Sequence, residues 1–359
     1  MSKLQVFRSV IVFTLLCLAL IAFFKIWPIY RFSTLPAETE KKESTFLLVE
    51  PGANPWSIAR ELESTGVTSD SVQFHRLGRI MGYWKNLKVG DYELSPNMAP
   101  IKIFETLGSG KSTDRAVTFQ EGINLFQIAD KLSNLGYVKR ETFISAARDP
   151  SFLKSLGFAP PIPPSLEGYL FPETYRLNRT MRERDILKLL YQNFSVVWND
   201  RLAARASDLG MTRNEVITLA SIIEKETGAA SERKIISSVF HNRLKKKMRL
   251  QTDPTIIYGI WESYNGNIKL SHKKIKNQYN TYVIKGLPIG AIANPGKKSI
   301  EAALFPEKTN FLYFVSRNDG THKFTSTYKE HIEAVNKYQL DPKARRGKSW
   351  RDLEKSKTR

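Results

Sequence analysis

The sequence of 359 residues contains a single cysteine, Cys17, and only five histidines, which are scattered along the chain. One cysteine excludes a disulfide within the chain and a cysteine-based metal site. No histidine lies in the H-E-x-x-H pattern or another metal-ligand spacing, so we expect neither a metal nor another cofactor. The G-x-S-x-G elbow of many serine hydrolases is also missing, although the three members of a Ser-His-Asp triad need not be adjacent in sequence.

Acidic residues are few relative to basic ones: 35 Asp and Glu stand against 55 Lys and Arg, which gives a net charge of +20. Such a charge favours an anionic partner, namely nucleic acid, a membrane surface or a cell-wall polymer. The sequence contains no zinc-finger spacing, no basic region with heptads and no aromatic–basic RNA-binding signature. We therefore expect no nucleic acid partner.

The N-terminal part of the chain contains an apolar run over residues 9–24, followed by Trp27 and Tyr30. Aromatic residues at the end of such a run are typical of the headgroup region of a membrane. No small-residue cleavage site follows closely, which argues against a signal peptide. We predict a cytoplasmic N-terminus (1–8) and a single transmembrane anchor (9–30) in contact with membrane lipid. The rest of the chain is then expected at the inner (plasma) membrane on its extracytoplasmic, or periplasmic, side.

An internal repeat organises the next part of the chain. A strand at 46–49, followed by Pro-Gly and a helix, recurs 70 residues later at 116–119, followed by Glu-Gly and a helix. We predict an α+β fold in which a small strand–helix–helix–strand unit, similar to the glycan-binding LysM fold, precedes a mixed α+β domain with a mostly helical core. The predicted boundaries are a linker (31–45), the LysM-like unit (46–112), the second domain (113–340, including the second repeat 116–190) and a basic tail (341–359).

The stretch 219–228, LASIIEKETG, ends an apolar helix with two carboxylates, Glu224 and Glu226. Thr212 and Glu215 form a predicted capping box at the start of this helix. Apolar residues surround most of its circumference, which predicts burial. A buried carboxylate loses hydration, so two of them are unusual. The alternative is that both side chains reach solvent at the helix end.

Other local signals predict the elements around this helix. We expect Gly228 to stop it, as glycine commonly does at a helix C-terminus. Residues 182–209 read as one helix, and residues 231–247 read as another with Ser231 at its cap. Asp253 is expected to cap a further helix, with the proline after it in the first turn. A hairpin is predicted between 311–316 and 323–325.

Several short motifs follow one another along the chain, in this order: LEGYLFPETY, ASIIEKETG with SER, NRL, MRLQTDPT, YNTY, GLPIGAIANPG and LYFV. Together they resemble the endolytic murein transglycosylase (YceG-like) family over about residues 46–340. The resemblance implies a membrane-anchored lytic transglycosylase with a LysM-like region, which cleaves within peptidoglycan strands and leaves 1,6-anhydro-N-acetylmuramic acid ends. It also implies that Glu224, the first Glu of EKET, is the catalytic acid/base. Ile289 departs from the more usual GLPPG form of one motif.

The helical wheel adds modest support for Glu224. Small residues such as Ala220 and Ser221 share its face and leave room for a sugar, whereas the bulky Ile222 and Ile223 share the face of Glu226. A lytic transglycosylase needs one carboxylate only, because the 6-hydroxyl of the substrate is the nucleophile. Candidate substrate-binding residues are Ser221, Glu226, Gln251, Asp253, Tyr279, Asn280, Tyr282 and Asn294.

The predicted function is therefore an endolytic peptidoglycan lytic transglycosylase that terminates nascent glycan strands. The expected partners are peptidoglycan strands, membrane lipid and, by family logic, peptidoglycan synthases. Two alternatives stay open at this point. One is a hydrolase that uses Glu224 with Asp253 or Glu226 as a second carboxylate. The other is a non-catalytic, wall-binding scaffold.

Overall fold

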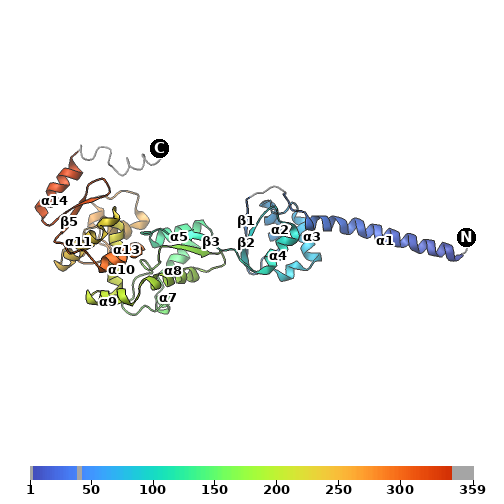
Figure 1. Cartoon of the computed structure of the whole chain (residues 1–359), viewed down its shortest axis with the longest axis horizontal. Helices are drawn as coiled ribbons and strands as arrows, with labels where there is room; N and C mark the ends of the chain where they lie inside the picture. The colour runs from blue at the N-terminus through green and yellow to red at the C-terminus, as the bar shows by residue number, and fades with distance from the viewer. Residues whose placement is uncertain (1–2, 39–42, 342–359) are drawn as a thin grey trace. The chain divides into compact units, whose positions relative to one another are not determined.

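The computed structural model describes residues 3–38 and 43–341. Residues 1–2 of the predicted N-terminus and residues 39–42 of the predicted linker lie outside the described residues. So does the predicted basic tail from residue 342 onward. The chain divides into two compact units, one formed by residues 1–116 and 176–181 and the other by 117–175 and 182–359 (Figure 1). Both units combine helices with short two-stranded sheets, so the predicted mixed α+β class is confirmed.

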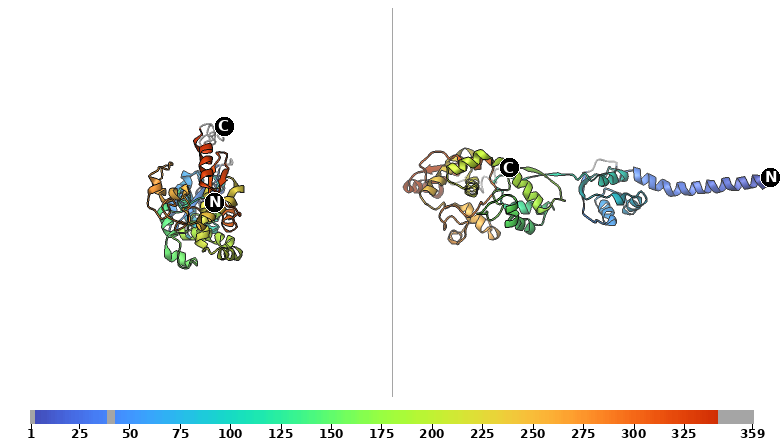
Figure 2. Two further views of the ribbon diagram at one scale, coloured as in Figure 1. Left: turned by 90° about the vertical axis from the view of Figure 1, so that its left-hand side faces the viewer. Right: turned by 90° about the horizontal axis from the view of Figure 1, so that it is seen from below.

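The first unit begins with the long helix α1 (Lys3–Thr34), which is one continuous ribbon in the right-hand view of Figure 2. Its C-terminal part packs on α3 (Ser71–Ile80) and α4 (Pro100–Ser109). Among the residues that the structure describes, no helix has both the length and the apolar character that crossing a bilayer takes.

The remainder of the first unit is built around one antiparallel strand pair, β1 (Thr45–Val49) with β2 (Gly90–Leu94). Between them come α2 (Pro55–Ser64), α3 and the 3-10 turn Tyr83–Asn86. Asn54 and Asp70 cap the two helices by accepting hydrogen bonds from main-chain N–H groups. The order strand–helix–helix–strand is the predicted one; the likeness to the LysM fold stays a prediction.

Asp91 on β2 fixes two later segments of the chain to the first unit. Its carboxylate is fully buried, 2.9 Å from Nη2 of Arg115 and 2.6 Å from Nη2 of Arg179. Burial alone would raise the pKa of Asp91, but the hydrogen bonds from the two arginines outweigh it and hold the pKa below its usual range. This ion pair explains why residues 176–181 belong to the first unit.

The second copy of the repeat follows, and boundaries between the two units fall within both of its strands. In chain order its elements are β3 (Arg115–Thr118), α5 (Leu125–Asn134), α6 (Arg140–Ala147), α7 (Pro150–Ser155), β4 (Thr174–Leu177) and α8 (Glu183–Val197). β3 pairs with β4, as β1 pairs with β2. The single helix predicted over 182–209 is wrong, because the chain breaks after α8 and Asn199 caps a separate helix, α9 (Asp200–Asp208).

Helix α10 (Arg213–Glu226) lies at the centre of the second unit. It packs against α9, α11 (Arg233–Lys245), α12 (Asp253–Gly259) and α13 (Lys297–Leu304). The capping box of Thr212 and Glu215 is present, and every residue from 216 to 223 is buried. The predicted buried helix is therefore confirmed, and its last turn carries Glu224 and Glu226.

Two predicted helix signals next to α10 are wrong. The helix ends at Glu226, and Gly228 does not take the left-handed conformation of a C-terminal cap. Glycine is needed there because a Cβ would lie 2.6 Å from the carbonyl oxygen of Gly320. Ser231 does not cap α11, since it lies within the 3-10 turn Ala230–Glu232.

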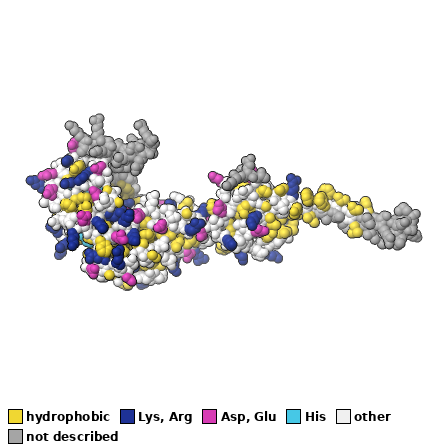
Figure 3. Space-filling view, viewed as in Figure 1, with side chains coloured by type: hydrophobic (Ala, Val, Ile, Leu, Met, Phe, Trp, Pro, Cys, Tyr) yellow, Lys and Arg dark blue, Asp and Glu magenta, His cyan; other side chains and the backbone are white. Residues whose placement is uncertain are grey.

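The C-terminal part of the second unit contains the predicted hairpin, β5 (Tyr313–Ser316) with β6 (His322–Thr325). It follows the 3-10 turns Trp261–Ser263 and His272–Lys274 and precedes α14 (Tyr328–Val335) and the π-helix Asn336–Leu340. Lys and Arg side chains are spread over the visible face of this unit with acidic side chains between them (Figure 3).

Candidate functional site

The two carboxylates at the end of α10 have different surroundings. Oε2 of Glu224 accepts a hydrogen bond of 3.0 Å from the main-chain N–H of Gly296, just before α13. Its Oε1 lies 3.6 Å from Nη2 of Arg233, at the start of α11, and the two side chains are only 9% and 12% exposed, respectively. Both oxygens of Glu224 therefore have partners that connect α10 to neighbouring helices.

A loop approaches the aliphatic part of the Glu224 side chain. A Cβ added to Gly122 would lie 3.4 Å from Cγ of Glu224. The ammonium of Lys225 donates to the carbonyl oxygen of Gly122 at 3.2 Å, which holds this loop against the helix end. The helical wheel predicts room for a sugar next to Glu224, and in the structure the loop at Gly122 lies close to Cγ of that side chain.

Glu226 lies instead at a cavity of about 350 Å³. The hydroxyl of Thr252 donates a hydrogen bond to its Oε1. Burial raises the pKa of Glu226, and the hydrogen bond from Thr252 offsets part of that increase. A carboxyl group with a raised pKa next to a cavity is a candidate for a catalytic acid. The other lining residues are Phe240, Arg243, Leu250, Gln251, Thr252, Asp253, Tyr282, Tyr313, Phe314, Tyr328 and His331.

Asp253 lines the same cavity and does not cap α12. The cap position belongs to Thr252, and no side chain makes a capping bond there. Oδ1 of Asp253 accepts a hydrogen bond of 2.6 Å from the hydroxyl of Tyr282 and lies 3.6 Å from Nζ of Lys273. Burial and the charge of Asp253 raise the pKa of Tyr282, so its hydroxyl stays protonated. A second carboxylate thus lies at the same cavity as Glu226.

The structure places three other predicted substrate-binding residues differently. Gln251 lines the cavity at Glu226 and holds a left-handed main-chain conformation, with φ of 50°. Ser221 is buried and accepts a hydrogen bond from the N–H of Ile292, which is a structural role. Asn280 is also buried and donates to three main-chain carbonyl groups of the loop before it, so its role is structural as well.

Asn294 belongs to a buried network away from the cavity. Its Oδ1 accepts from the N–H groups of Gly168 and Leu170, and its Nδ2 donates to Oε1 of Glu167 at 2.9 Å. Burial raises the pKa of Glu167 to about 8, although hydrogen bonds to the N–H of Leu125 and to a tyrosine hydroxyl lower it in part. Tyr279, the last predicted residue, lines a different cavity. The network holds the LEGYLFPETY segment in place.

Thr252 is the site residue that sequence reasoning missed. It stands next to Asp253 in the QTDP motif, but only the fold brings its hydroxyl to Glu226, 26 residues earlier in the chain. Sequence reasoning also missed Arg243. Its side chain is largely buried, lines the same cavity and donates to the carbonyl oxygens of Leu250 and Leu312. In the part of the chain that the structure describes, no His, Cys, Asp or Glu cluster is arranged to hold a metal ion.

Residues 47–337 match the YceG-like family. The endolytic murein transglycosylase of Bacillus subtilis (strain 168) is 34% identical over 318 residues, which cover 84% of this chain and 87% of that protein. The endolytic murein transglycosylase of Streptococcus pneumoniae serotype 2 (strain D39 / NCTC 7466) is 29% identical, with 84% of this chain and 60% of that protein covered.

A crystal structure of a putative YceG-like protein from Listeria monocytogenes is also similar, with 31% sequence identity and a TM-score of 0.58. The similarity covers 81% of this chain and 98% of that one. The matching family extends over most of the chain, and the order of its motifs agrees with the resemblance seen in the sequence. This chain belongs to the YceG-like family.

Proposed function

We propose that this chain is an endolytic peptidoglycan transglycosylase, a lyase that cleaves the β-1,4 bond between N-acetylmuramic acid and N-acetylglucosamine within glycan strands. Family membership and the names of its relatives support this activity. The observation that carries it is the carboxyl group of Glu226, which has a raised pKa and lies at a cavity. We assign the role of acid and base to Glu226 in place of Glu224.

The reaction requires one carboxyl group that changes its protonation state twice. Protonated Glu226 gives its proton to the glycosidic oxygen, and the bond from C1 to that oxygen breaks. The resulting carboxylate then takes the proton of the 6-hydroxyl of the same N-acetylmuramic acid, whose oxygen bonds to C1. Glu226 is protonated again at the end, and no water is consumed. The nucleophile is intramolecular, so its effective concentration is high.

The contacts of Glu226 suit both halves of this cycle. Burial favours the protonated form that the first step needs. The hydroxyl of Thr252 and the positive charge of Arg243 stabilise the carboxylate that forms in between. The two oxygens of Glu224 are engaged instead with the N–H of Gly296 and with Arg233. Its proposed role is to position the last turn of α10.

Asp253 bears on the alternative of a two-carboxylate hydrolase, because it lines the same cavity. Tyr282 and Lys273 both engage its Oδ1, which favours a role in orienting groups over a role as nucleophile. Mass spectrometry of the products from purified peptidoglycan tests the proposal. Anhydro ends are expected. Reducing ends, with one added water, would establish a hydrolase, and no products under any condition would leave a wall-binding scaffold.

The cellular setting is part of the same proposal. The apolar run at 9–24 supports an anchor over residues 9–30, contact with membrane lipid and an extracytoplasmic position at the inner membrane. The strand–helix–helix–strand order of the first unit supports glycan binding by a LysM-like unit. An enzyme that cuts inside glycan strands near the membrane would terminate nascent strands. It would do so next to the peptidoglycan synthases that make them. Alkaline phosphatase fused after residue 341 tests the orientation, since it is active only outside the cytoplasm.

A further inference from the structure

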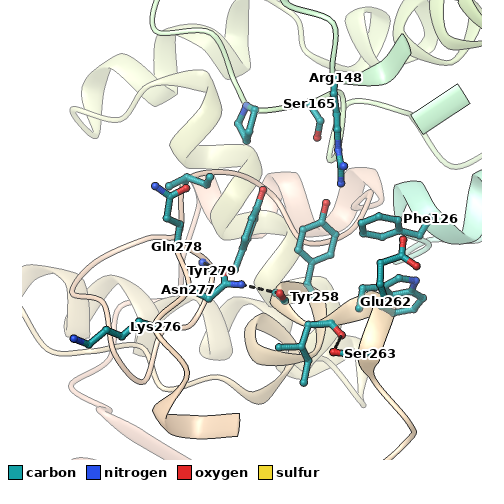
Figure 4. Close-up of a pocket in the computed structure, with 15 residues that line it drawn as sticks. Phe126, Arg148, Ser165, Tyr258, Glu262, Ser263, Lys276, Asn277, Gln278 and Tyr279 are labelled. Atoms are coloured by element: carbon teal, nitrogen blue, oxygen red, sulfur yellow. Dashed lines mark hydrogen bonds between the residues drawn. The ribbon is translucent and has the colours of Figure 1, made fainter. Parts of the chain in front are cut away.

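A second cavity, of about 790 Å³, lies at the opposite end of α12 (Figure 4). Thr252 and Asp253 at the start of this helix line the cavity of Glu226, whereas Tyr258 near its end lines the second one. The two cavities share no lining residue. A helix of seven residues is about 10 Å long at ~1.5 Å per residue, so a polymeric substrate is able to reach both cavities.

The charged groups of this cavity leave an excess of positive charge. Arg148 and Lys276 line it together with one acidic residue, Glu262. Glu262 is already paired, since its Oε1 accepts from Nη2 of Arg140 at 2.8 Å. Arg148 lies over the ring of Phe126, 5.4 Å from its centroid, and forms no direct ion pair with any carboxylate in the described residues. Its positive charge acts on the buried Glu167, whose pKa it lowers, but in the described part of the chain no direct ion pair occupies the guanidinium. A guanidinium without a direct ion pair, facing a cavity, suits an anionic group.

The aromatic residues of this cavity pack mainly on one another. The rings of Phe126 and Trp261 are stacked at 5.9 Å between centroids, with 8° between their planes. The rings of Tyr258 and Tyr279 lie 4.8 Å apart at 59°. In Figure 4 the side chain of Arg148 points toward the hydroxyl of Tyr258. The hydroxyl of Tyr258 is already hydrogen-bonded to Glu167, so the cavity offers cationic donors more than a free aromatic face for stacking on a sugar.

We propose that this cavity binds a carboxylate group of the peptide stem on the substrate strand. The inference rests on the proposed function, which makes peptidoglycan the substrate. The stem is attached to N-acetylmuramic acid and carries free carboxylates, which match the fork of Arg148 and the ammonium of Lys276. Binding of a stem at one end of α12 would help to hold the glycan strand at Glu226 at the other end.

Calorimetric titration of the full chain in detergent tests this inference directly. The probe is a disaccharide of N-acetylglucosamine and N-acetylmuramic acid with a tetrapeptide stem, which lacks the bond that the enzyme cleaves. The same disaccharide without the peptide, and the same probe with amidated carboxylates, serve as comparisons. We expect the charged probe to bind at least about 10-fold more tightly than either, because a charge-assisted hydrogen bond is lost in both.

Variants locate the binding. Arg148→Gln is expected to weaken binding of the charged probe about 10-fold, and Lys276→Gln is expected to weaken it less. Lys188→Gln, on the exposed side of α8, is the matched control and should bind as the unmodified protein does. Unchanged affinity in Arg148→Gln would overturn the inference. The inference would also be overturned if the disaccharide without its peptide, or an unrelated acidic peptide, bound as tightly as the charged probe.

A further variant separates this inference from the proposed function. In Glu226→Gln the charged probe is still expected to bind more tightly than the amidated one, because Glu226 lies outside this cavity. If Glu226→Gln were fully active on peptidoglycan, the proposed function would fail, and the titration would still report on the cavity at Arg148. If Glu226→Gln were inactive and Arg148→Gln bound the probe normally, only the present inference would fail.

Discussion

The hydroxyl of Thr252 donates a hydrogen bond to Oε1 of Glu226 at 2.5 Å, and this bond joins the start of α12 to the last turn of α10. It is the contact that distinguishes the two carboxylates of the EKET motif. Glu226 has a neutral hydroxyl as its direct partner, whereas Glu224 has an arginine. A neutral donor holds the carboxyl group in place and lets it gain or lose a proton.

Replacing Thr252 with valine removes this donor and keeps the shape of the side chain. Because the hydrogen bond lowers the pKa of Glu226, its loss should raise that pKa further. The acid then stays protonated to a higher pH. We predict that the alkaline limb of the pH profile of kcat/KM moves to higher pH in Thr252→Val. An unchanged limb, or one at lower pH, would contradict the prediction.

Thr255→Val is the control for that profile. The hydroxyl of Thr255 donates to the main-chain carbonyl of Thr252 and contacts the hydroxyl of Thr281, but it does not contact Glu226. We therefore expect some loss of stability in Thr255→Val and no movement of the alkaline limb.

The raised pKa of Glu226 also predicts how stability depends on pH. The folded protein binds this proton more tightly than the unfolded chain does, in which a glutamate titrates at about 4.3. The free energy of unfolding therefore loses a contribution as pH rises above about 4.3. We predict that Glu226→Gln is more stable than the unmodified protein at pH 7 and that the difference shrinks toward pH 4. Thermal unfolding at both pH values measures it; a difference that does not change with pH would refute the explanation.

A pair of glycines with the same main-chain conformation tests the packing of the LEGYLFPETY segment. Gly168 has φ of 88°, and a Cβ there would lie 2.5 Å from Cβ of Ala291 and 2.7 Å from Cγ2 of Ile217. Gly157 has φ of 89°, with no atom within 4 Å of such a Cβ. Gly157→Ala should cost about 1 kcal/mol, from the left-handed conformation alone.

Gly168→Ala should cost about 2 kcal/mol or more beyond that value, because it also forces overpacking against α10. Denaturant unfolding of the two variants measures the difference between them. Equal losses of stability would show that the close approach of Gly168 to Ala291 and Ile217 is relieved at little cost.

Local sequence signals predicted the elements well where the determining contacts are also local. The capping box of Thr212 and Glu215 and the apolar circumference of α10 are both properties of one helix, so the sequence shows them. The hairpin of β5 and β6 is local for the same reason. The family, too, followed from the order of short motifs.

The choice between Glu224 and Glu226 depends on contacts that no local pattern contains. Gly122 lies more than 100 residues before Glu224, and the N–H of Gly296 lies 72 residues after it. Both lie against the side chain of Glu224. Asp253 is a second example. The helix cap lies at Thr252, one position earlier than predicted, so the side chain of Asp253 lines the cavity instead of capping α12.

Release of anhydro-muropeptides from purified peptidoglycan by Glu226→Gln and Glu224→Gln, measured side by side, tests the central claim most directly. We predict that Glu226→Gln lowers the rate by at least about 100-fold, as expected for a lost general acid. Glu224→Gln should keep most of its activity, since an amide oxygen still accepts the N–H of Gly296. An inactive Glu224→Gln beside an active Glu226→Gln would contradict the account and restore the assignment that the sequence alone suggests.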